Sequence, residues 1–430
     1  MKLNLNSAAI LPALMIILIF LSGCKDTTHE EITYKANVPV YMGLDEFRRA
    51  VKTTEPQVLV NPGKIYFKDN FIFVNEFHEG VHVINNANPA APEMVAFVQI
   101  PGNVDIAIRN NILFADSYID LVAIDISDPS NPVEVDRVED AFPNVLPEPD
   151  LNYPVYGLDF SKGVVTGWET REITEVVEKD AYINQNYLIF NDLGVPAVNG
   201  AEVSIGPSAT GVSGSMARFT VSGDYMYTVH NNNLKVFSID ATPGISSGNS
   251  IPLNRQVETI FPYNNKLFLG TTTGMLVYDL SAPAAPVYVS EFNHINSCDP
   301  VVVEGNLAYV TLRSGTQCNG FTNQLDVVDI SSLTNPFLVK SYPMYNPHGL
   351  GIDNHTLFIC DGDAGLKVYD ATDPMEIHMH QLAHFSDIKT YDVIPYNGLL
   401  MLIGAGGLYQ YDYSDLDSLR LLSHIPVAIP

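Results

Sequence analysis

The sequence has 430 residues, of which 46% are hydrophobic, and its formal net charge is −27. This composition excludes a disordered chain, because there is enough apolar surface to form a large packed core. The acidic excess is spread along the chain and no basic patch accompanies it. Nucleic acid is therefore not an expected partner, since binding to the phosphate backbone rewards clustered Lys and Arg.

The first 24 residues are typical of an exported bacterial lipoprotein. Lys2 precedes an uncharged apolar run over residues 8–21, which is short for a bilayer-spanning helix and has the layout of a signal peptide. The sequence Leu21-Ser22-Gly23-Cys24 that ends this segment resembles a lipobox, in which the Cys is acylated and becomes the new N-terminus. We therefore expect a signal peptide over residues 1–23 and a lipidated, flexible tether over residues 24–35. The alternative is an ordinary signal peptide followed by an accidental Cys.

A lipidated Cys24 would anchor the protein, because each buried methylene of an acyl chain contributes about 0.8 kcal/mol to membrane binding. No later stretch is apolar for long enough to cross a bilayer. The expected location is the cell envelope, at the periplasmic or the exposed face of the outer membrane. Lys25-Asp26 followed by Glu30-Glu31 loosely resembles the acidic export signals of Bacteroidetes lipoproteins. We expect a monomer that contacts the membrane through its lipid.

One phrase recurs along the rest of the chain. "LVAIDISDPSNP" contains Asp125, and "LDVVDISSLTNP" contains Asp329 at the same offset. Related phrases are anchored on Asn85, Asp125, Ser238, Asp279, Asp329, Asp370 and Asp412. Apart from an interval of 113 residues before Ser238, neighbouring anchors are 40 to 50 residues apart. A period near 40 that contains several short β segments is typical of a propeller blade.

The fold class that we predict is all-β: a β-propeller of seven four-stranded blades over residues 36–430. The long interval predicts an insertion over residues 143–216, within or after blade two, which contains Trp168. An eighth blade hidden in this insertion is the alternative. The segment over residues 38–51 is expected to pack at the closure of the ring, as a short helix after a strand.

The repeated phrases resemble the LVIVD repeat family, whose name matches "LVAID" and "LDVVD" here. The resemblance covers most of the chain from Gly63 to Pro430 and implies a β-propeller in a secreted or surface protein. Members of the family share no chemistry that the resemblance could assign to this chain. Ser238 replaces the Asp of the phrase in blade three, and no Pro follows Asp412 in blade seven.

The Asp of the phrase is expected to have a structural role. An Asp side chain accepts hydrogen bonds from the backbone two residues ahead, and a following Pro presets the turn. We therefore predict a turn between the third and fourth strands of each blade.

A candidate binding site lies where the first strands begin. In a propeller these strands line the central channel, so residues five or six positions before the turn that ends each first strand should meet at one mouth. This count gives Asp105, Arg218, Glu258, Asp299, His348 and Asp392. Such a cluster could bind a ligand or a cation. The alternative is that these residues are polar because channel mouths are wet.

Cys298 starts the first strand of blade five, and Cys318 lies in the enlarged loop between the second and third strands of that blade. Both positions share one face and export exposes the chain to an oxidising compartment, so we predict a disulfide between them. Cys360 ends the strand "LFIC" and is expected to be a buried free thiol.

The remaining motifs give little indication of metal binding or catalysis. "CDGDAG" offers Asp361 and Asp363 as weak calcium ligands, but the later ligands of a calcium loop are missing. No nucleophile elbow, zinc-protease motif or nucleotide-binding loop occurs. We therefore expect no cofactor and no enzymatic activity, and a binding or scaffold module for a protein or glycan ligand. The alternative is a carbohydrate-active hydrolase or lyase that uses the carboxylates and His348.

Overall fold

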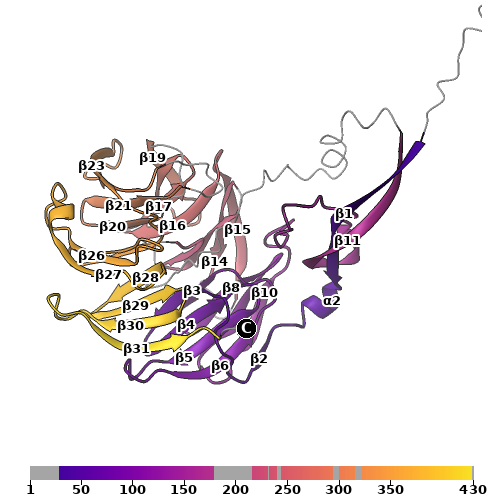
Figure 1. The fold of residues 1–430 in the computed structure, drawn as a ribbon, viewed down its shortest axis with the longest axis horizontal. Coiled ribbons are helices and arrows are strands. Elements are labelled where there is room, and N and C mark those ends of the chain that lie inside the picture. The colour runs from indigo at the N-terminus through magenta and orange to yellow at the C-terminus, as the bar shows by residue number, and fades with distance from the viewer. Residues whose placement is uncertain are drawn as a thin grey trace, which may run out of the picture. The chain divides into compact units, whose positions relative to one another are not determined.

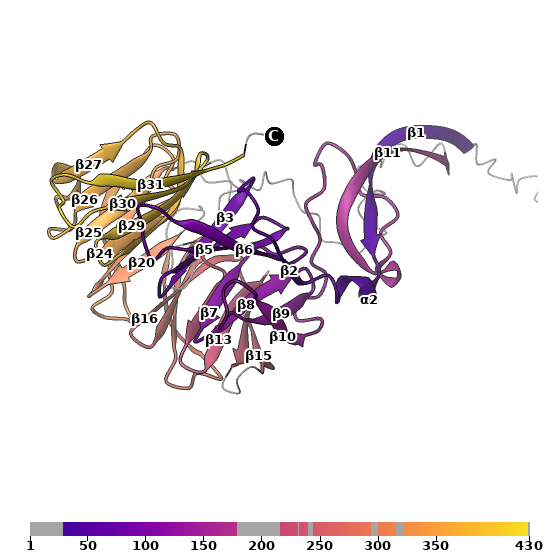
Figure 2. The same cartoon turned by 90° about the horizontal axis from the view of Figure 1, so that it is seen from below.

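The structure is a computed structural model that describes residues 29–178, 216–230, 232–239, 244–293, 300–314 and 322–428. In these residues seven antiparallel sheets follow one another around a ring, which Figures 1 and 2 show from two sides. Each sheet contains four consecutive strands, and the first sheet has an additional edge strand. The prediction of an all-β propeller with seven blades is confirmed. The predicted signal peptide and Cys24 lie outside the described residues.

The blades are numbered in chain order. Blade one comprises β3 (Pro62–Lys68), β4 (Phe71–Glu76), β5 (Gly80–Asn85) and β6 (Glu93–Gln99). Blade two comprises β7 (Ile106–Arg109), β8 (Ile112–Ser117), β9 (Asp120–Asp125) and β10 (Val133–Val138). Blade three comprises β12 (Phe219–Ser222), β13 (Tyr225–His230), β14 (Asn233–Ser238) and β15 (Ser246–Pro252). Blade four comprises β16 (Val257–Tyr263), β17 (Lys266–Thr271), β18 (Gly274–Asp279) and β19 (Val287–Asn293).

The three remaining blades follow the same order. Blade five comprises β20 (Val301–Glu304), β21 (Leu307–Leu312), β22 (Gln324–Asp329) and β23 (Phe337–Pro343). Blade six comprises β24 (Leu350–Asp353), β25 (Thr356–Cys360), β26 (Leu366–Asp370) and β27 (Gln381–Phe385), with the 3-10 turn η3 (Ile377–Met379) before β27. Blade seven comprises β28 (Thr390–Tyr396), β29 (Leu399–Gly404), β30 (Gly407–Asp412) and β31 (Arg420–Pro426).

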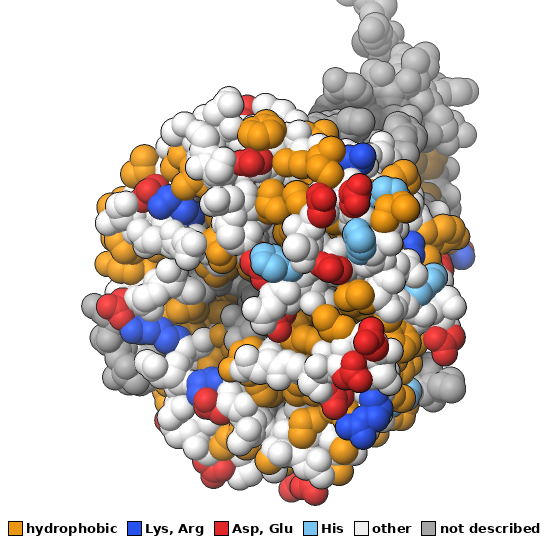
Figure 3. Space-filling view, turned by 90° about the vertical axis from the view of Figure 1, so that its left-hand side faces the viewer, with side chains coloured by type: hydrophobic (Ala, Val, Ile, Leu, Met, Phe, Trp, Pro, Cys, Tyr) orange, Lys and Arg blue, Asp and Glu red, His pale blue; other side chains and the backbone are white. Residues whose placement is uncertain are grey.

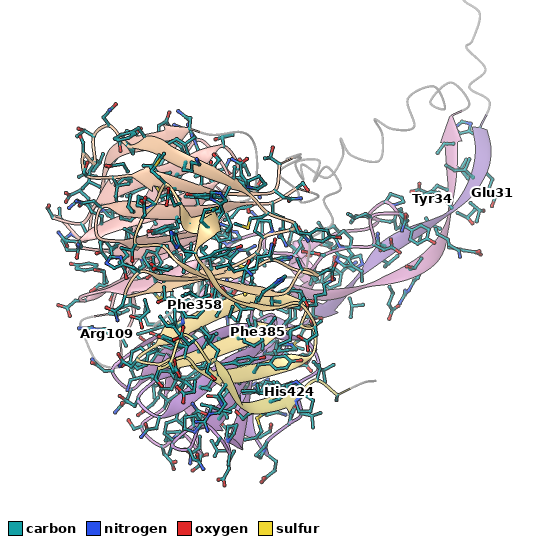
Figure 4. All side chains as sticks on the ribbon, turned by 60° about the vertical axis from the view of Figure 1, so that its left-hand side comes forward. Glu31, Tyr34, Arg109, Phe358, Phe385 and His424 are labelled. Carbon is teal, nitrogen blue, oxygen red and sulfur yellow. The ribbon has the colours of Figure 1, made fainter. Side chains whose placement is uncertain are left out.

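The inner strands are apolar on both faces because neighbouring blades cover both sides of each sheet. In β25 all five residues are buried, including Phe358, which Figure 4 labels. The outer strand β10 has no buried residue. One apolar cluster joins blades one, two and three, and another joins blades one and seven. The core is therefore divided among the blade interfaces.

The repeated Asp forms the predicted turn. In blades two, four, five, six and seven a carboxylate oxygen of this Asp accepts the backbone N–H two residues ahead, and Asn85 does the same in blade one. Each turn joins the third and fourth strands of its blade. The structural role predicted for this residue is confirmed.

The ring closes between its first and last blades. Leu59, which is fully buried, forms a parallel bridge with Val427, and its carbonyl accepts the N–H of Ala428 at 2.7 Å. Side chains of blade seven, among them Ile394 and Met401, pack against blade one. Closure therefore pairs the chain just before blade one with the chain just after blade seven.

The segment over residues 38–51 does form a short helix after a strand, but its predicted place at the ring closure is wrong. Helix α2 (Leu44–Phe47) lies beside blade two, where Phe47 is buried with Tyr118. Arg48 follows the helix, and its Nε lies 3.1 Å from Asp120 of β9. Strand β2 (Lys52–Thr54) then pairs with β6 as a fifth strand of blade one. Burial of Phe47 and pairing of Arg48 hold the segment at blade two.

The chain divides into two compact units, and the propeller belongs to the larger one. The described part of the smaller unit covers residues 29–39, 149–159 and 168–178. It contains most of the two-stranded sheet of β1 (His29–Met42) and β11 (Val164–Glu178); the 3-10 turn η1 (Phe160–Lys162) precedes β11.

Two expectations change in the smaller unit. Residues 29–35, expected in the flexible tether, lie in β1 because they pair with β11: Tyr34, labelled in Figure 4, donates a hydrogen bond to Glu175 at 2.8 Å. The insertion follows a complete blade two, and in its described residues it forms a ribbon with β1 and not an eighth blade. None of the helices in the described part of the chain is long and apolar enough to cross a bilayer.

Candidate functional site at the channel mouth

The first strands of neighbouring blades lie beside one another around the ring, from β3 to β28. Because the blades are built in the same antiparallel order, these strands all begin on one face, together with the loops that join second and third strands. Asp105, Arg218 and His348 lie just before these starts. Glu258 and Asp392 lie just after them, within β16 and β28. Asp299 lies outside the described residues. We call this face of the ring the channel mouth. Figure 3 shows the opposite face of the ring, on which the first strands end; acidic and His side chains lie there beside a hollow.

Asp105 is held by residues of the neighbouring blades. One carboxylate oxygen lies 2.6 Å from Nζ of Lys64 and accepts the backbone N–H groups of Arg218 and Phe219 at 2.6 and 3.1 Å. Lys64 and Asp105 are both buried, and burial lowers the pKa of Lys64 and raises that of Asp105. Asp105 therefore joins the first strands of blades one, two and three. This structural role leaves little of its carboxylate for a ligand.

Lys64 was missed in the sequence. A signal was present, because Lys64 stands five residues before Asp69, at the turn that ends the first strand of blade one. The same count gives Asp105 in blade two. The ring of polar residues thus begins in blade one.

Arg218 and Glu258 are on neighbouring first strands. Arg218 is exposed at the start of β12, and Glu258 is partly buried on β16. Burial raises the pKa of Glu258 to about 7, against the opposing effect of Arg218 and Arg313. The carboxyl of Glu258 is therefore close to half protonated at neutral pH.

A β-bulge presents Glu258 at the mouth. Val257 pairs with Thr271 and Thr259 pairs with Gly270, so Glu258 is an extra residue in its strand. Strand β28 has the same irregularity at Tyr391, between Thr390 and Asp392. Bulges redirect side chains and are frequent beside binding sites.

Arg313 and His348 form the next part of the mouth. Arg313 follows β21, and its guanidinium lies 3.1 Å from Nε2 of His348. Both residues are buried. Burial, followed by the charges of Arg313 and Lys389, lowers the pKa of His348 to about 2, so its imidazole is neutral and accepts from Arg313. Arg313 was also missed, although a lone Arg directly after the apolar strand "LAYVTL" is a signal in the sequence.

Asp392 is fully buried against a glycine of blade six. A Cβ atom on Gly349 would lie 2.0 Å from Oδ1 of Asp392, which no ordinary contact allows. The N–H of Gly349 donates to the carbonyl of Tyr391 at 2.9 Å. Gly349 therefore lets the start of blade six approach β28 closely enough for Asp392 to lie against its backbone.

The two residues considered as calcium ligands form hydrogen bonds and ion pairs within the protein. Asp361 accepts the N–H groups of Tyr345 and Asn346 and pairs with Lys367 at 2.5 Å. Asp363 is exposed and pairs with Lys389 at 3.1 Å. Within the ranges that the structure describes, no three His, Cys, Asp or Glu side chains are grouped as metal ligands. The Asp361 contacts are those of a loop-stabilising residue.

The cysteine predictions have different outcomes. Cys360 is a buried free thiol, as expected, and burial raises its pKa. Cys298 and Cys318 lie outside the described residues, so their disulfide stays a prediction.

The mouth thus combines an exposed guanidinium, a buried guanidinium, a carboxyl that titrates near neutrality and a neutral imidazole. Side chains of this kind bind anions and hydroxylated ligands by directed hydrogen bonds. The fold and this mouth define the class of protein: a seven-bladed β-propeller with a polar channel mouth.

The comparisons agree with this class. The family pattern described as the LVIVD repeat matches residues 104–140 and 297–343, which correspond to blades two and five. The chain therefore contains LVIVD repeats and has a β-propeller fold. No curated protein sequence matches it.

Two solved structures show the same fold. A protein from Lactobacillus plantarum has a TM-score of 0.53 at 11% identity, over 88% of this chain and 97% of that one. The periplasmic gluconolactonase of Pseudomonas aeruginosa has a TM-score of 0.52 at 9% identity, over 88% of this chain and 96% of that one. At such low identity, these similarities concern the fold alone.

Proposed function

We propose that the protein is a lipid-anchored β-propeller of the cell envelope that binds a ligand or partner at its channel mouth. The observation that carries the binding function is the convergence of Arg218, Glu258, Arg313 and His348 from four consecutive blades. Anchoring is supported by the lipobox that ends at Cys24.

The anchoring is tested with Cys24→Ala in a bacterial host. The acylated protein should sediment with membranes and incorporate labelled palmitate, whereas Cys24→Ala should do neither. Cys360→Ala is the matched control, because it removes a cysteine that is buried in the propeller. Equal membrane binding by Cys24→Ala would refute the lipid anchor.

Binding is tested by a thermal-shift screen of the full-length protein in detergent, against sugars, sugar acids, peptides and divalent metals. A ligand of the mouth should raise the melting temperature of the wild type and have a smaller effect on Arg218→Gln. Arg420→Gln is the matched control, because Arg420 is an exposed arginine on the outer strand β31. A screen in which nothing binds, or in which both variants respond alike, would contradict the proposed site.

A carbohydrate-active hydrolase or lyase is the second candidate. Glu258 favours it, because a carboxyl with a pKa of about 7 suits a general acid. The periplasmic gluconolactonase noted above shares the propeller fold, but a shared fold does not imply a shared reaction. Turnover of a glycan or sugar lactone that is lost in Glu258→Gln, with the melting temperature retained, would favour the enzyme over the binding module.

A further inference from the structure

We propose that the channel mouth recognises a small monocarboxylate, and that Glu258 holds a proton in the bound complex. This inference rests on the proposed binding function and names the chemical class of its ligand. It follows from the order of charged groups around the mouth, the bulge in β16 and the number of carboxyls nearby.

The order of the strands places a carboxyl between two guanidiniums. Arg218 starts β12, Glu258 is on β16, and Arg313 belongs to blade five, whose first strand β20 is next to β16. Both arginines act electrostatically on Glu258. The backbone of Arg218 is held by Asp105 and the side chain of Arg313 by His348, so both sides of the site are positioned by buried contacts.

Guanidinium groups match carboxylates in geometry, because their parallel N–H donors meet both oxygens. Arg218 is exposed, so its guanidinium is accessible to an anion from solvent. Glu258 is the extra residue of a bulge and lies within electrostatic range of Arg218. A ligand carboxylate at Arg218 would therefore lie within reach of the Glu258 carboxyl.

The surrounding charges favour a monoanion over a dianion such as phosphate. Glu148 lies within electrostatic range of Arg218 and adds a second carboxyl to the site. His348 is neutral and adds no positive charge. Four further titratable groups act electrostatically within this cluster: Lys64, which pairs with Asp105, His230 with Arg218, Lys389 with His348, and Asp116 with Lys64.

Proton uptake is expected because the ligand carboxylate would lie close to the Glu258 carboxyl. Free Glu258 is close to half protonated at neutral pH. A bound carboxylate is a like charge that favours the protonated form, which can then donate a hydrogen bond to the ligand. Above neutral pH, the proton must come from solvent when the ligand binds. Affinity should then fall about tenfold for each pH unit.

The test is calorimetric titration of the full-length protein in detergent with acetate, D-gluconate and D-glucuronate, and with D-glucose and inorganic phosphate for comparison. At least one carboxylate should bind with a dissociation constant below about 10 mM, and at least tenfold more tightly than glucose or phosphate. At pH 8.5, binding heats in buffers of different ionisation enthalpy should show uptake of about one proton.

The variants separate the two parts of the proposal. Arg218→Gln should weaken carboxylate binding about tenfold or more, whereas Arg420→Gln should not change it. Glu258→Gln should abolish proton uptake and the fall in affinity between pH 6 and pH 8.5.

Other outcomes would refute the inference. If no carboxylate bound, or if binding took up no proton, it would be wrong. If glucose or phosphate bound more tightly, and Arg218→Gln weakened that binding, the proposed function would stand while its ligand class would be wrong. Failure of the proposed function would show in the broader screen, in which nothing binds.

Discussion

The guanidinium of Arg313 lies 3.1 Å from Nε2 of His348, so a residue at the end of a strand in blade five holds the imidazole that precedes blade six. The hydroxyl of Thr311 donates to the carbonyl of His348 at 2.7 Å, from the same side. These contacts join two blades, and burial together with the charge of Arg313 lowers the pKa of His348 and keeps its imidazole neutral. The stability of this interface should therefore depend on pH.

We expect His348→Gln to cost more stability at pH 8 than at pH 5. Burial and Arg313 lower the pKa of His348 from 6.5 to about 2. Below pH 6.5 the unfolded chain binds a proton that the folded protein does not, so the contribution of His348 is full above that pH and is lost as the pH falls. The difference in unfolding free energy between wild type and variant should shrink by about 2 kcal/mol from pH 8 to pH 5.

Urea denaturation at the two pH values measures this difference. His384→Gln is the matched control, because His384 is exposed on β27. An equal cost of His348→Gln at both pH values would contradict a neutral imidazole.

Glu258→Gln should change stability in the opposite direction with pH. The pKa of Glu258 is raised from 4.5 to about 7, so the folded protein binds the proton more strongly than the unfolded chain. The contribution of Glu258 is full below pH 4.5 and is lost as the pH rises through 7. The variant should match the wild type near pH 4.5 and exceed it by about 1–2 kcal/mol at pH 8, after allowance for solvent screening of this partly buried group.

Melting temperatures across this pH range provide the measurement. The control is Glu55→Gln, at an exposed position, whose melting temperature should change with pH as that of the wild type does. A variant that is less stable than the wild type at pH 8 would show that Glu258 is ionised and stabilising there.

Lys64→Met should destabilise the propeller by about 3–5 kcal/mol, because it leaves the buried carboxylate of Asp105 without its charged partner. Lys68→Met on the same strand is the control, since Lys68 pairs with exposed Asp69 and should cost about 0.5 kcal/mol or less. Denaturant midpoints measure both losses. If the two variants lost the same amount, the Lys64–Asp105 pair would have no special role in the ring.

The exported protein should contain a disulfide between Cys298 and Cys318. Mass spectrometry of a non-reduced digest should find the two cysteines in one linked peptide, and Cys360 should react with an alkylating reagent after unfolding only. The chain-entropy model gives such a loop about 3 kcal/mol of stabilisation, which reduction should remove. Free alkylation of Cys298 and Cys318 in the folded, exported protein would refute the bond.

The residues of the channel mouth show what a repeat pattern can predict. Asp105, Arg218, Glu258, His348 and Asp392 could be predicted because repeated units place equivalent positions on one face. Their individual roles could not. Asp105 resembles Asp392 in the sequence, yet it accepts two backbone N–H groups and a lysine from neighbouring blades. Those partners stand 41, 113 and 114 residues away, so no local pattern reveals them.

The placement of α2 gives the same lesson for the fold. The sequence predicted a helix after a strand, because helix formation depends on nearby residues. The position of the helix depends on where Phe47 is buried. Phe47 packs with Tyr118 and Val164, which are far along the chain. The ribbon of β1 and β11 was missed for a similar reason, since a strand in a tether is specified by its partner.

By itself the sequence determined the period, the turn at each repeated Asp and hence a ring of seven blades, because these features arise from short-range alternation and turn chemistry. Only the tertiary structure decided which mouth residues are engaged in the scaffold and which face the channel, and that Arg313 and Lys64 belong with them. Burial and the charges of other blades set the protonation of Glu258 and His348. These are properties of the assembled ring, because electrostatic interactions depend on distance in space and not on separation along the chain.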